Sequence, residues 1–148
     1  MVILDTDHLT IIQRQNEPAY TRLRTRLQQT ASDTICTTIV NVEEQMRGWL
    51  AVISRSRRLE HEIAAYRQLH ALFTFFSDIP VLDFDESAAV QFSQLRRARL
   101  RLGSMDLKIA AIARSQNALL LSRNLTDFQR VPGLRVEDWT QTEEVPSS

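Results

Sequence analysis

Short apolar runs alternate along the chain with longer segments of helical periodicity. Five runs of apolar or β-branched residues have the length of strands, at 2–4, 34–39, 80–84, 118–122 and 134–136. Recurrence of apolar residues every three or four positions predicts helices after residue 5, at 18–29, from 41 to about 53, at about 60–77, from 85 to about 102 and at 105–116, with a turn or short helix at 125–128. This alternation is typical of an α/β domain around a mostly parallel sheet.

Polar residues at the ends of these segments predict where helices begin and end. The expected N-caps are Thr6 or Asp7, Asn41, Asp85 and Ser104. Glu44 follows Asn41 by three residues, which is the spacing of a capping box. Gly103 is expected to end the helix that Asp85 begins.

Four acidic residues stand at places that an α/β fold brings to the carboxyl edge of its sheet, where ligands bind. Asp5 ends the first strand, and Glu44 lies in the first turn after the second. Asp106 lies in the first turn of the helix before residues 118–122, and Asp127 follows that strand. Two carboxylates about 4 Å apart repel by about 4 kcal/mol at an effective dielectric constant of about 20, so four together would hold protons or a cation. An all-oxygen ligand set favours Mg²⁺ or Mn²⁺ over Zn²⁺.

Each of these acids also has a structural interpretation. Glu44 can be a capping-box residue, Asp106 can stabilise a helix N-terminus through the helix dipole, and Asp127 can be a turn residue. Asp5 is different, because a carboxylate at a buried strand end needs a partner. The metal-site hypothesis therefore depends on the set of four.

The length of 148 residues and the 43% content of hydrophobic residues suit one domain. We assign residues 1–140 to that domain and expect residues 141–148, which are polar and acidic, to form a disordered tail. The sequence has one cysteine, Cys36, and neither a secretory signal nor an apolar run of about 18 residues. These features predict a cytoplasmic protein.

The formal net charge is zero, which by itself argues against a general nucleic-acid binder. The basic residues are nonetheless concentrated, and their densest run comprises Arg96, Arg97, Arg99 and Arg101. This run could guide RNA toward Asp106 through phosphate contacts. It fits a solvated helix end equally well, since arginine is favoured near a helix C-terminus.

Four segments resemble, in order, the motifs of the PIN-domain family. They are residues 2–9, 42–48, 103–113 and 121–134. In the second, Glu44 stands four residues before Gly48, and in the third, Asp106 heads a helix of small residues. The fourth contains Ser-Arg-Asn-Leu-Thr-Asp-Phe. The resemblance covers residues 1–139 and is nearest to the VapC-type toxins of VapBC toxin–antitoxin pairs.

The resemblance implies a PIN-like three-layer α/β/α sandwich with a five-stranded, mostly parallel sheet. It implies an endoribonuclease dependent on Mg²⁺ or Mn²⁺ that acts on tRNA or rRNA and leaves a 5′-phosphate and a 3′-hydroxyl. It further implies a homodimer that is inhibited by a cognate VapB-type antitoxin. The metal-binding and catalytic roles would fall to Asp5, Glu44, Asp106 and Asp127.

Three further residues take auxiliary places in this resemblance. Asn124 would be a polar neighbour of the metal site. Asp7 stands where the toxins usually have Asn, which adds a negative charge. Ser122 stands where Thr is commoner and keeps the hydroxyl group.

Two other interpretations stay open. Asp5-Thr-Asp7 after an apolar strand also matches the nucleophile loop of haloacid-dehalogenase-type phosphatases, although these need a lysine and later paired acids, and Lys108 is the single lysine. The chain could instead be a non-catalytic RNA- or protein-binding module with the same fold, and the complete set of four acids argues against this interpretation.

Overall fold

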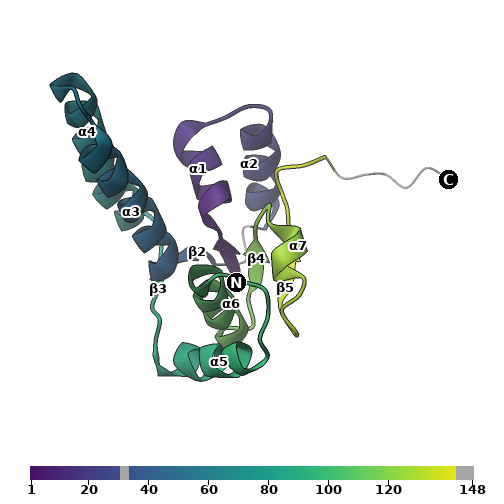
Figure 1. Cartoon of the computed structure of the whole chain (residues 1–148). Helices are drawn as coiled ribbons and strands as arrows, with labels where there is room; N and C mark the ends of the chain where they lie inside the picture. The colour runs from purple at the N-terminus through teal and green to yellow at the C-terminus, as the bar shows by residue number, and fades with distance from the viewer. Residues whose placement is uncertain (31–33, 143–148) are drawn as a thin grey trace.

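Five parallel strands form the centre of the molecule in the computed structural model, which describes residues 1–30 and 34–142 (Figure 1). Their order across the sheet is β3-β2-β1-β4-β5. The strands are β1 (Val2–Leu4), β2 (Ile35–Thr38), β3 (Val81–Leu82), β4 (Leu119–Leu121) and β5 (Arg135–Glu137). The expected α/β fold with a parallel five-stranded sheet is confirmed, and each strand lies within two residues of its expected range.

Helices flank both faces of this sheet (Figure 1). They are α1 (Thr6–Arg14), α2 (Ala19–Gln29), α3 (Ile39–Arg55), α4 (Leu59–Ser77), α5 (Glu86–Arg97), α6 (Ser104–Ser115) and α7 (Leu125–Phe128). No helix in the described part of the chain is long and apolar enough to cross a membrane.

The alternation of side chains along β1 divides the core between the two faces. Val2 and Leu4 pack with apolar residues of α1 and α2 on one face. Ile3, between them, points to the other face, where buried residues of α5, α6 and α7 cover the sheet. Because all three residues are buried, β1 is covered on both sides, and the residue that follows it starts from a fixed position.

Helices α3 and α4 form a hairpin that extends away from the rest of the molecule (Figure 1). Large apolar side chains remain exposed along it, namely Ile39, Leu50, Leu59, Ile63, Tyr66 and Phe73. An exposed apolar surface of this kind is typical of a protein-binding site.

Several predicted helix ends are wrong. Helix α5 ends at Arg97, five residues early, and Arg99 then adopts a left-handed backbone with φ 53°. Gly103 does not end that helix but precedes α6 in extended conformation, and α6 begins at Ser104 with no side-chain cap. The first helix is capped by Asp5, not by Thr6 or Asp7.

The N-cap predicted at Asn41 is wrong as well. Helix α3 begins at Ile39, and the Thr38 hydroxyl caps it by accepting a hydrogen bond from the Asn41 N–H. Glu44 therefore lies in the second turn of the helix and has no capping-box role. Of the tail predicted at residues 141–148, residues 143–148 lie outside the described part of the chain.

Candidate functional site

Asp5 is held rigidly at the carboxyl end of β1. Its side chain is only 6% exposed and accepts hydrogen bonds from Thr6 N–H at 2.9 Å, Asn41 Nδ2 at 2.8 Å and Ser122 Oγ at 2.7 Å. Burial and the nearby charge of Asp7 nevertheless raise the pKa of Asp5 above its usual value, because together they outweigh these hydrogen bonds. A preorganised carboxylate that favours protonation can bind a cation in place of the proton.

Glu44 approaches the same edge of the sheet from α3. Its Oε2 accepts a hydrogen bond from the Thr6 hydroxyl at 3.0 Å, which ties α3 to the first turn of α1. Partial burial raises the pKa of Glu44 to about 7, with further upward contributions from Asp5, Asp106 and Asp7. Glu44 is therefore poised to exchange a proton near neutral pH.

Asp106 faces the other acids from the first turn of α6. Burial raises its pKa, and so do the charges of Asp5, Asp127 and Asp7. Within residues 1–30 and 34–142, no hydrogen-bond donor or cationic side chain contacts its carboxylate. The sequence analysis allowed for a purely structural Asp106 at a helix N-terminus, but repulsion by three acids is opposite to what stability alone would select.

Asp127 completes the group from α7. Asn124 Nδ2 donates to its Oδ2 at 3.1 Å, and Arg130 Nη1 donates to its Oδ1 at 3.2 Å. The charge of Asp127 raises the pKa of Asp106, and the charges of Asp5 and Asp106 raise the pKa of Glu44. The fold thus brings the four acids predicted from the sequence to one edge of the sheet as a chain of interacting charges.

The donor chemistry of this acidic edge fits a divalent cation with oxygen ligands. Among the described residues, no group of three His, Cys, Asp or Glu side chains is arranged so that it could hold a metal ion. Mg²⁺ does not need such a set, because it keeps several waters and takes one or two direct carboxylates together with substrate phosphate. Asp5 and Asp106 suit the direct positions, since Asp5 is preorganised and no donor among the described residues contacts the carboxylate of Asp106.

Titration of Glu44 should make the metal-free protein less stable as the pH rises. The raised pKa means that the folded state holds a proton that the unfolded state loses between the ordinary value of 4.5 and about 7. The free energy of unfolding therefore contains a contribution that is present below pH 4.5 and is lost through pH 7. Urea unfolding in EDTA should show that Glu44→Gln loses less stability than the unchanged chain between pH 5 and pH 8.

Glu43→Gln is the matched control, because Glu43 is the neighbouring residue on α3 but pairs with Arg47 on the surface. Its pH profile should follow that of the unchanged chain. Identical profiles for the unchanged chain and Glu44→Gln would contradict the assignment of this titration to Glu44.

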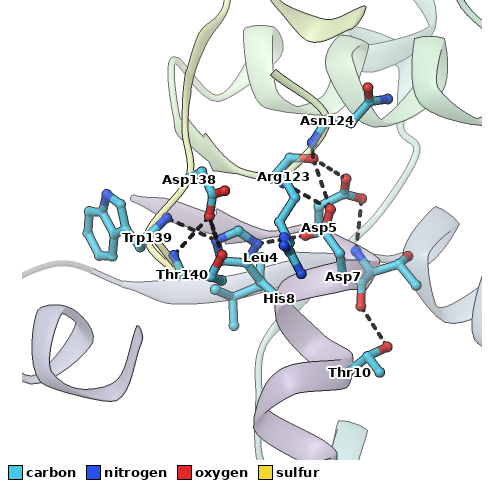
Figure 2. Close-up of polar contacts among 12 residues, drawn as sticks. Leu4, Asp5, Asp7, His8, Thr10, Arg123, Asn124, Asp138, Trp139 and Thr140 are labelled. Atoms are coloured by element: carbon cyan, nitrogen blue, oxygen red, sulfur yellow. Dashed lines mark hydrogen bonds and ion pairs between the residues drawn. The ribbon is translucent and has the colours of Figure 1, made fainter. Parts of the chain in front are cut away.

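Two of the auxiliary residues, Asp7 and Asn124, are drawn near Asp5 in Figure 2, and the third, Ser122, hydrogen-bonds to Asp5. Ser122 Oγ donates to Asp5 and accepts a hydrogen bond from the Asn124 N–H at 3.0 Å. Asp7 Oδ2 accepts from the Arg123 N–H at 2.9 Å. The turn after β4 is thus fixed to the acids at the start of α1.

His8 explains why an acid fits position 7. It is fully buried, its Nε2 accepts a hydrogen bond from the Trp139 N–H at 3.2 Å, and its Nδ1 lies 2.6 Å from Asp7 Oδ1 (Figure 2). Because Nε2 accepts, Nδ1 must carry the proton and donate to Asp7. Asp7 thus meets donors on both oxygens, whereas the amide group of an Asn would place its own donor against one of them.

Sequence reasoning missed the second layer of this site. It treated Asn41 as a helix cap, yet the side chain of Asn41 bridges Asp5 and Thr6. The sequence predicts His8 at the surface of the first helix, whereas the structure buries it fully. The sequence did contain a positional signal, because polar residues follow strands β1 and β2. It could not give their partners, because Asn41 binds Asp5 and Thr6, and His8 binds Trp139, across 35 or more residues of sequence.

The arginines of the basic run lie around the end of α5, and all are exposed. Arg96 and Arg97 occupy the last turn of α5, while Arg99 and Arg101 lie in the loop that leads to α6. Arg130 links this loop to the acids, because its Nη1 contacts both the Arg101 carbonyl and Asp127. The structure thus places the run beside the acidic edge but does not test RNA binding.

The sequence and the fold are both similar to those of known proteins. The sequence profile of the PIN domain family matches residues 2–134. The tRNA(fMet)-specific endonucleases VapC of Salmonella typhimurium and Shigella flexneri are 30% and 34% identical, each over 93% of this chain and over 96% and 97% of their own lengths. The fold is similar to a chain in the crystal structure of DNA-bound VapBC from Salmonella typhimurium, with a TM-score of 0.72, 29% identity and coverage of 93% of this chain and 97% of that one.

Proposed function

The chain belongs to the PIN domain family and to its VapC group of toxin ribonucleases, and from this premise we propose that it is a divalent-metal-dependent endoribonuclease of a toxin–antitoxin pair. The observation that supports the metal dependence best is the raised pKa of Asp5, Glu44 and Asp106, which results first from burial and then from the charges of neighbouring acids. Such an arrangement costs stability unless a cation or a proton compensates it.

Asp5, Glu44, Asp106 and Asp127 would hold Mg²⁺ or Mn²⁺, with Asp5 and Asp106 as the direct ligands. When bound, the cation would supply Lewis-acid activation of water and of the scissile phosphate. Asp5 contributes a fixed oxygen, because three hydrogen bonds prevent its rotation. Ser122 and Asn124 keep the turn after β4 in register with it.

Glu44 is suited to receive the proton of the attacking water. Thr6 occupies its Oε2, which leaves Oε1 available, and in the metal-free protein burial and the neighbouring acids raise the pKa of Glu44 to about 7. In-line attack by water breaks the bond from phosphorus to the 3′-oxygen, and the products carry a 5′-phosphate and a 3′-hydroxyl. Neither a histidine nor the RNA 2′-hydroxyl is needed as nucleophile.

We propose tRNA as the substrate class, because two relatives matched over nearly their whole length are tRNA(fMet)-specific endonucleases. An RNA substrate also implies action in the cytoplasm. Removal of metal should abolish cleavage of initiator tRNA by the purified chain, and Mg²⁺ or Mn²⁺ should restore it. Elongator tRNA and rRNA serve as specificity controls, and end-labelling should find 3′-hydroxyl ends. Cleavage that persists in EDTA would rule out the scheme.

We also propose a VapB-type antitoxin as partner and a homodimer as the assembly. A groove of about 480 Å³ between α1, α3 and α4 begins beside Glu44 and is lined farther along by Trp49, Leu72 and Phe75. Its apolar walls and acidic end suit a peptide that carries a basic residue toward the acids. The similar solved structures include VapBC assemblies, which supports this assignment.

A further inference from the structure

A second cavity, of about 470 Å³, lies between the end of α5 and the start of α6. Three of its lining residues are cationic, namely Arg96, Arg99 and Lys108, and we call this cavity the basic cavity. The rest of its lining consists of the Ser104 hydroxyl and apolar side chains that include Phe92. Since no acidic residue lines it, the basic cavity carries a local charge of about +3 in a chain whose net charge is zero.

In the described part of the chain, no carboxylate forms an ion pair with Arg96, Arg99 or Lys108. Lys108 is only partly exposed, and its Nζ lies 6.0 Å from the ring centre of Phe84 and 5.9 Å from that of Phe92. Arg96 lies 5.5 Å from the Phe92 ring. Aromatic faces orient these cations but do not neutralise them, so an anion entering the cavity would gain three charge interactions.

The basic cavity lies close to the acidic edge. Ser104 and Lys108 are four residues apart and share one face of α6, whereas Asp106, between them in sequence, faces the acids. The two sites are therefore separated by about one helix diameter, roughly 10 Å. Arg130 joins them on the other side, because it contacts both Asp127 and the loop that carries Arg99.

We propose that the basic cavity binds one or two RNA phosphates that flank the scissile one. This inference rests on the proposed function and deepens it, because four acids repel a polyanion and the enzyme needs nearby cations to hold it. Only Arg96 and Arg99 of the basic run line the cavity, and Lys108 joins them from α6. Arg97 and Arg101 do not line it, which separates this site from the general effect of a basic helix end.

The test is a triple variant, Arg96→Gln, Arg99→Gln and Lys108→Met, which removes the charges and keeps the apolar stems. Its control is Arg24→Gln, Arg67→Gln and Arg97→Gln, which removes three exposed charges outside the cavity. Fluorescence anisotropy with a labelled single-stranded oligoribonucleotide, in EDTA to prevent cleavage, measures affinity between about 50 and 200 mM salt.

The cavity variant should bind RNA at least about tenfold more weakly at about 50 mM salt, and the slope of log K against log salt should fall by about 1. The control should bind almost as the unchanged chain does. Equal losses in both variants, unchanged affinity of the cavity variant, or absence of RNA binding by the unchanged chain would each overturn the proposal. So would a cavity variant that loses only antitoxin binding, because the cavity would then be a protein site.

The two proposals fail separately. RNA binding through the cavity by a chain that never cleaves in Mg²⁺ would refute the proposed function alone. Metal-dependent cleavage with full affinity in the cavity variant would refute the phosphate site alone. Circular dichroism of both triple variants establishes that they remain folded.

Discussion

Replacement of Asp5 by Asn should lower RNA cleavage by at least about 10²–10³-fold and should leave the metal-free protein at least as stable as the unchanged chain. The loss of rate follows from removing a charged ligand of a cation whose stabilisation of the transition state amounts to several kcal/mol, where each 1.36 kcal/mol corresponds to a factor of ten. Single-turnover cleavage in saturating Mg²⁺ measures it.

The stability of this variant is expected to move in the opposite direction for an electrostatic reason. The raised pKa of Asp5 means that its charge is unfavourable in the folded state at neutral pH, and the neutral amide removes that charge. Asn can keep the hydrogen bonds from Thr6 and Asn41 through its oxygen. Its amide N–H can donate to the Ser122 hydroxyl, which then acts as the acceptor.

Asp83→Asn is the matched control, because Asp83 is exposed in the loop after β3 and does not contribute to the raised pKa values of Asp5, Glu44 and Asp106. It should change neither cleavage nor stability. Asp5→Asn with full activity would exclude Asp5 from the metal site. A large loss of stability would show that Asp5 is mainly a structural N-cap, and the loss of activity would then carry no mechanistic meaning.

The fold was predictable because its signals are local. Apolar runs of strand length and helical periodicity place all five strands and the main helices, and both depend on neighbours within a few residues. Helix ends were less predictable. The early end of α5 depends on the left-handed backbone of Arg99, and the start of α3 depends on whether Thr38 or Asn41 turns toward the helix N-terminus.

The acids of the candidate site were predictable for a different reason. Parallel strands bring their carboxyl ends to one edge, so the acids that follow β1 and β4 are expected on the same edge of the sheet. The hydrogen-bond partners were not predictable, because Asn41 acts through contacts to Asp5 and Thr6, and His8 through a contact to Trp139, that only the folded chain creates. A side chain such as that of Asn41, which could either cap a helix or hydrogen-bond an acid of the site, cannot be assigned to one role from local sequence alone.

The candidate site combines energetically unfavourable negative charges with surroundings whose polar groups are hydrogen-bonded. No buried side-chain nitrogen or oxygen atom in the described part of the chain lacks a hydrogen-bond partner, whereas three acids have raised pKa values. The surrounding core must therefore be stable enough to offset the cost of burying these acids close to one another. This is the usual relation between a stable scaffold and a strained active site.

Phe128→Ala should test that dependence by lowering the free energy of unfolding by about 3–5 kcal/mol. Phe128 is 0% exposed and packs in the core that α5 and α6 form with the sheet. Helix α7 has only four residues and cannot be stable by itself, so this ring anchors the segment that carries Asp127. Out of a typical domain stability of about 5–15 kcal/mol, the loss is large.

Urea unfolding of Phe128→Ala should be compared with Phe73→Ala, which removes the same atoms from a side chain 66% exposed on α4. The control should stay within about 0.5 kcal/mol of the unchanged chain. At a temperature where Phe128→Ala is still folded, its cleavage should also fall, because Asp127 loses the anchor that holds it beside Asp106. A stability loss below about 1 kcal/mol would mean that the core does not depend on this ring, and full activity would mean that α7 holds Asp127 by its hydrogen bonds to Asn124 and Arg130 alone.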